Sequence, residues 1–407
     1  MKPLLLSLVL LTCLPARADW VFSASTEITA GKSVFHHLEA SGRQSLALAN
    51  GDVGIVWEDD HSGAPRCYLG LKSPAQSTFN IQSFGQGECF APGIAALDQG
   101  RFGLIWEDEA GVQTATVNAA KNAGKIGPAL QLAAAGGNQG SLAWHPAIGL
   151  VAAWTQPDNR WRQIWLARVN IDGTTPALIS KRPIETTPTK DDQLYPTLTP
   201  SPQGIDQGIS VAWEDRRLGH TVIFASHSAD AITWTAPARV SNNPTGKAQG
   251  TDLGRGTGAM RPVLVTFGQR LAAIWLDKRD FLSGYDVYGA LADANAKFTK
   301  NKKVQDSFGD AIAQWHPAAA ANSKGQLVVA WDDDRDGSSD IWLSALGPGD
   351  AFSENFTLPA ASGPVKQTDP VLALDEAGNL HLAWVQHEPD GRSSIQYSVG
   401  KPKSGNH

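Results

Sequence analysis

The stretch Ile55-Val56-Trp57-Glu58-Asp59 decides the fold, because the chain repeats it in altered form along its length. Further apolar runs end in a tryptophan at Trp106, Trp154, Trp213, Trp275, Trp331 and Trp384. The steps between successive tryptophans are 49, 48, 59, 62, 56 and 53 residues. A repeat of about 50 residues built from short strands is typical of a β-propeller. The sequence therefore predicts an all-β fold, a seven-bladed propeller in one domain.

Each repeat can be divided into four strands: a small apolar strand, the tryptophan strand, a strand with an aromatic residue, and a poorly matching outer strand. The seventh repeat ends at its third strand, near Val399, whereas residues 21–28 have no place in the first repeat. We expect residues 21–28 to complete the last blade, since a closed ring leaves no open sheet edge. A six-bladed ring with one irregular repeat is the alternative.

The first 18 residues resemble an export signal, with Lys2 before an apolar run and Ala16-Arg17-Ala18 as a cleavage site. That run is too short to anchor the chain in a bilayer. We therefore expect an exported protein, periplasmic or secreted, that does not insert into a membrane. Residues 19–400 would form a single propeller domain that stays monomeric, and residues 401–407 a flexible tail.

The net charge limits the classes of partner that the sequence supports, and the cysteine content indicates the redox compartment. Removal of Lys2 and Arg17 takes the formal charge from −6 to −8, which disfavours nucleic acid as a partner. The mature chain keeps Cys67 and Cys89, and an exported protein with two cysteines favours one disulfide. The predicted strand order places both cysteines at the same face of neighbouring blades. Two separate buried thiols are the alternative.

Ligands of propellers usually bind at the face where the first strand of each blade begins, here called the upper face. The residue before each first strand is often followed by proline, which we expect to make it extended and to aim its side chain at the axis. These candidate binding residues are Arg43, Tyr195, Arg261, His316 and Asp369. Trp161 and Trp315 lie outside the repeat pattern near this face, where they would either contact a sugar or pack between blades.

The acidic loops after the tryptophans favour a structural role. Pairs such as Asp333 and Arg335 recur at Asp215 and Arg217 and at Asp277 and Arg279, which indicates a repeated bond inside each loop. Asp332, Asp334 and Asp336 before Gly337 also imitate a calcium loop, although Leu343 stands where such a loop has a glutamate. We expect no cofactor, with calcium as a weak candidate, because no redox, nucleotide or serine-nucleophile motif is present.

The repeat resembles the sialidase-like bacterial propellers with BNR repeats over nearly the whole mature chain. Residues 228–234, Ser-Ala-Asp-Ala-Ile-Thr-Trp, are similar to the Asp-box of that family, which is a structural turn. The resemblance implies a propeller that acts on or binds sugars, with Arg43 as the match to the family's first catalytic arginine. The proline of that segment is missing, and Asp369 stands where the family has a tyrosine.

Three functions are consistent with these residues. The leading one is an exported propeller that binds a glycan or a protein at the upper mouth without turnover, with catalytic residues unassigned. The second is a polysaccharide-active enzyme, either a lyase using His316 or Tyr195 with Arg261, or a hydrolase drawing on a pair of carboxylates. The carboxylates at hand for a hydrolase are Asp59, Asp108, Asp215, Asp277 and Asp369. The third function is docking in the assembly of the cell envelope.

Overall fold

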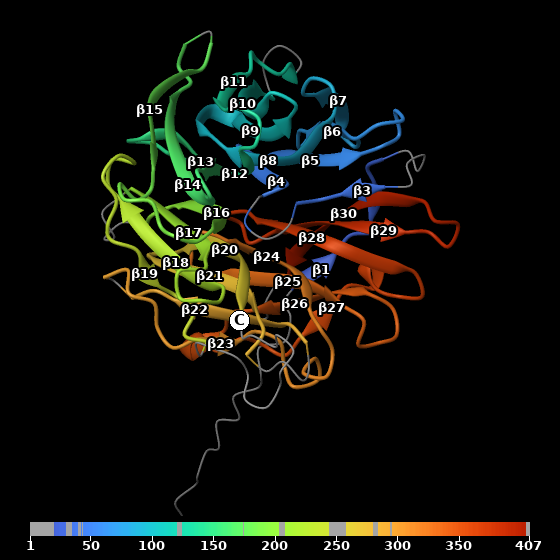
Figure 1. Cartoon of the computed structure of the whole chain (residues 1–407). Coiled ribbons are helices and arrows are strands. Elements are labelled where there is room, and N and C mark those ends of the chain that lie inside the picture. The colour runs from blue at the N-terminus through green and yellow to red at the C-terminus, as the bar shows by residue number, and fades with distance from the viewer. Residues whose placement is uncertain are drawn as a thin grey trace, which may run out of the picture.

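The protein is a seven-bladed β-propeller, as the sequence predicted (Figure 1). The computed structural model describes residues 20–29, 35–39, 42, 44–119, 124–173, 175–202, 208–243, 258–279, 284–293 and 295–403. Within these residues the strands form seven antiparallel sheets, one for each tryptophan repeat. The export signal with its cleavage site, Arg43 and residues 404–407 lie outside the described residues.

The first four blades follow the chain in order. Blade 1 comprises β3 (His36–His37), β4 (Leu46–Ala49), β5 (Asp52–Asp59), β6 (Arg66–Lys72) and β7 (Asn80–Phe84). Blade 2 comprises β8 (Cys89–Ala96), β9 (Arg101–Asp108), β10 (Gly111–Asn118) and β11 (Leu130–Ala133), with the short helix η1 (Asp98–Gly100). Blade 3 comprises β12 (Asn138–His145), β13 (Gly149–Asp158), β14 (Trp161–Asn170) and β15 (Ala177–Pro183). Blade 4 comprises β16 (Gln193–Pro200), β17 (Ile209–Asp215), β18 (Val222–Ser228) and β19 (Ala238–Arg239).

The last three blades complete the ring. Blade 5 comprises β20 (Ala259–Phe267), β21 (Arg270–Asp277), β22 (Asp286–Leu291) and β23 (Lys302–Lys303). Blade 6 comprises β24 (Trp315–Ala321), β25 (Leu327–Asp333), β26 (Asp340–Ala345) and β27 (Phe356–Thr357), with the helices η3 (Pro348–Asp350) and η4 (Pro359–Ala361). Blade 7 comprises β28 (Lys366–Leu374), β29 (Leu380–His387) and β30 (Ser393–Pro402), and its outer strands are β1 (Trp20–Phe22) and β2 (Thr26–Glu27). None of the helices in the described part of the chain has the length and apolar character needed to cross a bilayer.

The two ends of the chain meet in blade 7, which confirms the predicted closure. Trp20 pairs with Pro402 and Phe22 with Gly400, while Thr26 pairs with Tyr397 farther along β30. Strand β30 therefore continues past residue 400, where the sequence placed the end of the domain. The closure pairs the outer edge of β30 within the chain itself, so that edge is not left open to other strands.

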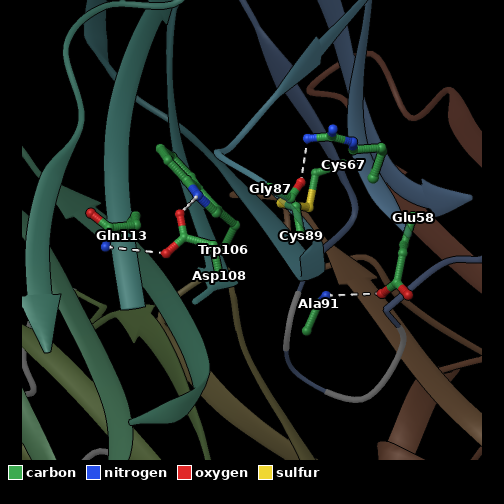
Figure 2. The surroundings of a disulfide bond; sticks show 9 residues. Glu58, Cys67, Gly87, Cys89, Ala91, Trp106, Asp108 and Gln113 are labelled. Atoms are coloured by element: carbon green, nitrogen blue, oxygen red, sulfur yellow. Dashed lines mark hydrogen bonds between the residues drawn. A yellow bond between two sulfur atoms is a disulfide. The ribbon is translucent and has the colours of Figure 1, made fainter. Parts of the chain in front are cut away.

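A disulfide joins blades 1 and 2 at the upper face, as predicted (Figure 2). Cys67 of β6 and Cys89 of β8 are both fully buried, and their Cα atoms lie 5.4 Å apart. The bond closes a loop with a sequence separation of 22 residues, which typically stabilises the fold by about 3 kcal/mol. A formed disulfide is consistent with an oxidising compartment.

The buried tryptophan of most blades is fixed by an acidic residue two positions later. The indole N–H groups of Trp57, Trp106, Trp213, Trp275 and Trp331 donate to Asp59, Asp108, Asp215, Asp277 and Asp333, at 2.8–3.0 Å. In blade 3 the acceptor is Gln156, which lies 3.1 Å from the indole nitrogen of Trp154. This interaction satisfies a buried donor at the point where the strand leaves the core, and we call it the tryptophan clamp.

Each clamp in blades 4, 5 and 6 also holds an arginine, as the repeated Asp–Arg pattern predicted. The guanidinium nitrogens of Arg217, Arg279 and Arg335 lie 2.6–2.7 Å from the same aspartates. The aspartate side chains are fully buried. These carboxylates are therefore engaged in holding the loop between the second and third strands.

The central cavity, about 400 Å³ in volume, is lined by the first strands of the blades. Gly42 lies across the axis at its upper end, because its carbonyl accepts from Ser141 in blade 3 and it contacts Thr197 in blade 4 and Pro262 in blade 5. A Cβ on Gly42, whose φ is +87°, would lie 2.4 Å from the carbonyl oxygen of Pro262. Only glycine fits at this position.

The tryptophan clamp predicts a large stability difference between two neighbouring aspartates. Asp333→Ala leaves the indole of Trp331 and the buried guanidinium of Arg335 without their acceptor, so the free energy of unfolding should fall by about 3 kcal/mol. Urea unfolding of the purified variants measures this difference. Asp334→Ala, which alters an exposed carboxylate of the same loop, is the matched control. A loss no larger than that of the control would contradict the clamp.

Candidate functional site

The upper mouth is surrounded by six residues in the left-handed backbone region. Their φ angles lie between +48° and +59°, at Ala91, Gln139, Tyr195, Arg261, His316 and Asp369. Each lies at a shift of register in the first strand of its blade. The predicted extended conformation of Tyr195, Arg261, His316 and Asp369 is therefore wrong. These positions are β-bulges, and a non-glycine residue is held there only at a cost of about 1–3 kcal/mol.

Contacts between neighbouring blades maintain most of these bulges. The backbone N–H of the bulged residue donates to a side chain of the preceding blade in five pairs, namely Ala91 to Glu58, Gln139 to Glu107, Tyr195 to Gln139, Arg261 to Glu214 and Asp369 to Asp332. Figure 2 shows the first of these bonds, beside the tryptophan clamp of blade 2. The residue after the clamped tryptophan supplies the acceptor in four of them. These bonds could not be predicted from the sequence, because the two partners of each bond lie in different repeats.

His316 and Asp369 come together at the mouth, on blades 6 and 7. The Nδ1 atom of His316 lies 2.7 Å from Oδ1 of Asp332, and its Nε2 atom lies 3.5 Å from Oδ1 of Asp369. The backbone N–H of Asp369 donates to the same oxygen of Asp332 at 3.2 Å. One buried carboxylate, that of Asp332, therefore fixes both the bulge of blade 7 and the imidazole of blade 6.

A second imidazole approaches Asp369 from blade 1. The Nδ1 atom of His37 lies 3.9 Å from Oδ1 of Asp369, and its Nε2 atom lies 3.2 Å from Glu39. The imidazole side chains of His37 and His316 are 33% and 43% exposed, whereas the carboxylates of Asp332 and Asp369 are only 3% and 11% exposed. Solvent at the mouth therefore meets the imidazoles, with the carboxylates behind them.

The sequence did not single out His37, because blade 1 departs from the repeat. His37 pairs with Glu58 as Phe90 pairs with Glu107, so it stands one position before the expected bulge. In blade 2 the ladder resumes with Gly93, but in blade 1 an insertion separates β3 from β4. Arg43, predicted as the residue before the first strand, belongs to this insertion and lies outside the described residues. The segment Phe35-His36-His37, which lies before the insertion, is the sequence feature that could have identified His37 as a mouth residue.

Arg261 and Tyr195 also lie together at the mouth. The guanidinium carbon of Arg261 lies 3.5 Å from the centroid of the Tyr195 ring, so the planar cation is stacked on the phenol. Beneath them Glu214, which is buried, accepts the backbone N–H of Arg261 at 2.8 Å. Burial raises the pKa of Glu214 to about 7, against the opposing effect of that N–H and of the Arg261 guanidinium.

The carboxylates behind the imidazoles keep them protonated. Burial alone would lower the pKa of His316, but the bond to Asp332 and the charge of Asp369 raise it to about 9, while Arg261 acts to lower it. Burial opposes the charged form of His37 as well, and Glu39, with Asp369, raises its pKa to about 9. At neutral pH the mouth therefore presents two imidazolium groups and the guanidinium of Arg261.

Asp369 is braced from its other side by Thr368 and His387. The Thr368 hydroxyl donates to Oδ2 of Asp369 at 2.9 Å and lies 3.0 Å from Nε2 of His387. Burial lowers the pKa of His387, so its ring is neutral at pH 7 and its Nε2–H can donate to Thr368. The brace leaves Oδ1 of Asp369 facing His37 and His316.

The two tryptophans predicted to lie near the mouth have different surroundings. Trp315 opens β24 and is 43% exposed, and its ring centroid lies 5.1 Å from that of Tyr285. Trp161 opens β14 on the rim of blade 3, where the guanidinium of Arg160 lies 4.8 Å above its ring. Only Trp315 is next to the imidazole cluster, because His316 follows it in the chain.

The weak calcium prediction finds no support in the arrangement of its residues. Asp332 is turned toward His316 and Asp369, whereas Asp334 and Asp336 belong to the exposed loop after β25. Among the described residues, no group of three or more histidine, cysteine, aspartate or glutamate side chains is placed to hold a metal ion.

Comparison with known proteins agrees with the architecture. No family model matches the chain, and no curated protein matches it. Among solved structures, the polysaccharide lyase Uly1 superposes with a TM-score of 0.57 at 8% identity, over 89% of this chain and 90% of that one. A protein of unknown function from Dyadobacter fermentans DSM 18053 gives 0.53 at 11% identity, over 95% and 100%. An α-L-arabinanase of Penicillium chrysogenum, complexed with arabinobiose, gives 0.47 at 13% identity, over 93% and 98%. The likeness to the first two structures, at these identities, is one of fold.

The raised pKa values predict a loss of stability in alkali. A histidine whose pKa is about 9 when folded and about 6.5 when unfolded stabilises the fold fully below pH 6.5 and loses that effect as pH rises through 9. The thermal unfolding temperature should therefore fall between pH 7 and 10, and fall less in the His37→Gln, His316→Gln double variant. Circular dichroism at each pH measures this.

His145→Gln is the control for this profile. His145 lies at the turn between β12 and β13, on the face opposite the mouth, and burial lowers its pKa. The ring is neutral in both states above pH 7, so this variant should keep the profile of the native protein. A double variant with that same profile would contradict the charge assigned to the mouth.

Proposed function

We propose that this protein binds an acidic oligosaccharide at its upper mouth without cleaving it. The observation that carries the proposal is the exposure of two imidazolium groups, of which His316 lies near Arg261, with their carboxylate partners buried behind them. The guanidinium of Arg261 offers charge-assisted N–H donors, which suit carboxylate or sulfate oxygens. The two imidazolium rings, whose N–H groups face Asp332, Asp369 and Glu39, add positive charge beside the ligand. A specific anion site also needs preorganisation, which the bulges and the buried acceptors supply.

Aromatic and aliphatic groups around the mouth favour a sugar as the carrier of that acid. Exposed large apolar residues of the upper face are Phe35, Phe90, Leu218, Phe308 and Trp315. A ring of a pyranose has one polar edge and an apolar face, so it can meet donors and aromatic rings together. Polysaccharide lyase Uly1, which has the same fold, supports a saccharide ligand by analogy only.

Hydrolysis is disfavoured by where the carboxylates lie. Asp59, Asp108, Asp215 and Asp277 all hold a tryptophan clamp, and Asp59, Asp215 and Asp277 are buried. Asp369 is shared between two imidazoles. A glycosidase needs two carboxylates that flank the scissile bond, one of them free to give a proton.

A polysaccharide lyase is the second candidate, favoured by the stacked pair of Tyr195 and Arg261 next to His316. Arg261 would neutralise the uronate carboxylate, and Tyr195 would take the proton from the adjacent carbon, because the imidazolium of His316 has no lone pair to accept it. The electron pair left behind would form the double bond as the glycosidic C–O bond breaks, and the leaving oxygen would take a proton.

We also propose a distant relationship to the sialidase-like propellers and an exported location. The turn at residues 228–234 supports the first, because Oδ1 of Asp230 accepts the backbone N–H groups of Ile232 and Thr233, both at 2.7 Å. These bonds lower the pKa of Asp230 and fix the turn in the manner expected of an Asp-box. The buried disulfide supports export to the periplasm or beyond.

Calorimetry with a panel of sialylated, uronate-containing, sulfated and neutral oligosaccharides tests the proposal. We expect binding of an acidic class alone, and a loss of at least about tenfold in affinity for Arg261→Ala, in keeping with a lost charged contact. Arg182→Ala, on the outer strand of blade 3, removes an exposed arginine far from the mouth and should bind normally.

Mass spectrometry of the same mixtures separates the remaining functions. Retention of the ligand without new products supports a binding protein. Products with an unsaturated end, lost in Tyr195→Phe, would establish a lyase, whereas products that have gained water would establish a hydrolase. Failure to retain any member of the panel would overturn the proposal and favour a protein partner.

A further inference from the structure

We infer that the upper face carries a second sugar subsite, in which Trp315 and Tyr285 stack a ring adjacent to the one held at the mouth. The inference rests on the proposed function, since it extends the same ligand outward from His316 over the junction of blades 5 and 6. It makes the ligand a chain of at least two sugar units rather than a single sugar.

The first observation is an aromatic pair in which Trp315 is exposed while Tyr285, which is partly buried, packs against the core of blades 5 and 6. Trp315 remains 43% exposed although it opens a strand, whereas the repeated tryptophan of the same blade, Trp331, is fully buried. Its ring lies 5.1 Å from that of Tyr285 at an angle of 55°, so the two rings form a bent surface. A tryptophan exposed beside a second ring offers a flat apolar surface on which a sugar ring can stack.

The second observation is that this surface is rigid before any ligand arrives. The backbone N–H of Gln314 donates to the carbonyl of Tyr285 at 2.8 Å, which ties the two aromatic segments together. The buried amide of Gln314 donates to the carbonyls of Gly309 and Ile312 and holds the loop that precedes β24. A preformed surface stacks a ring with little loss of conformational freedom.

The third observation concerns the polar surroundings of the pair. The ammonium group of Lys278 lies 4.6 Å from the centroid of the Tyr285 ring. On the other side the chain continues directly from Trp315 into His316, whose imidazole faces the mouth. An apolar surface bordered by cations on both sides suits a sugar ring that bears hydroxyl or acidic groups better than a purely apolar ligand.

The position of the subsite can be tested against an equivalent residue in blade 2. Phe90 pairs with Glu107 as Trp315 pairs with Asp332, and Phe90 is also exposed, at 37%. The next residue in blade 2, however, is Ala91, which brings no charge to the mouth. A ligand anchored at His316 should therefore lie over Trp315 and not over Phe90.

An array of sialylated, uronate-containing and sulfated glycans, each in a short and a long form, tests the inference. The native protein should bind the long form of its ligand more tightly than the short form. Trp315→Ala should abolish that preference, with a loss of about tenfold for the long form, as expected for one stacked ring. Trp315→Phe should restore part of it, and Phe90→Ala should bind as the native protein does. Thermal unfolding of each variant shows that the fold is intact.

Different results would overturn different parts of the proposal. Equal binding of short and long forms by the native protein, or a preference that survives in Trp315→Ala, would refute the second subsite and leave the mouth in place. The same loss in Phe90→Ala would refute its position over blades 5 and 6. Binding of no acidic glycan by the native protein would refute the proposed function together with the subsite.

Discussion

The hydrogen bond from a buried tryptophan to the aspartate two residues later is the interaction on which the rest of the structure depends. It forms in five blades, and glutamine replaces the aspartate in blade 3. In blade 7 the equivalent Gln386 donates to Glu388, and the indole nitrogen of Trp384 has no hydrogen-bond partner among the residues that the structure describes. The clamp fixes where each second strand ends. It therefore also fixes the height at which the residue between its tryptophan and its aspartate reaches the neighbouring blade.

The residue directly after the clamped tryptophan links the scaffold to the mouth. Glu58, Glu107, Glu214 and Asp332 each accept the N–H of a bulged residue from the following blade, so the spacing of the clamp sets the geometry of the ring. The acidic loops, which supply most of the carboxylates near the mouth, are thereby used for structure. Function is left to the bulged side chains, which vary from blade to blade without disturbing the backbone bonds that hold them.

The sequence predicted the fold because its signals are periodic and local. Seven tryptophan strands, the disulfide and the closing strand follow from spacing and from strand order, and each was found. The site was predicted only in part, since a ring position can be counted but a contact between blades cannot. His316, Asp369, Arg261 and Tyr195 were named, yet Asp332 was named only because its loop imitates a calcium loop. His37 was missed because an insertion shifts blade 1 out of the repeat.

Asp332 shows how a repeated structural residue becomes part of a site. In its blade an aspartate replaces the usual glutamate, and its oxygen accepts both the backbone N–H of Asp369 and the imidazole of His316. Burial raises the pKa of Asp332, and His316 opposes this, so each group depends on the other for its charge. In the preceding blade the equivalent position is Leu276, which offers no acceptor to His316. The imidazole of His316 is held instead by Asp332 of its own blade, and the same carboxylate accepts the backbone N–H of the bulge in blade 7.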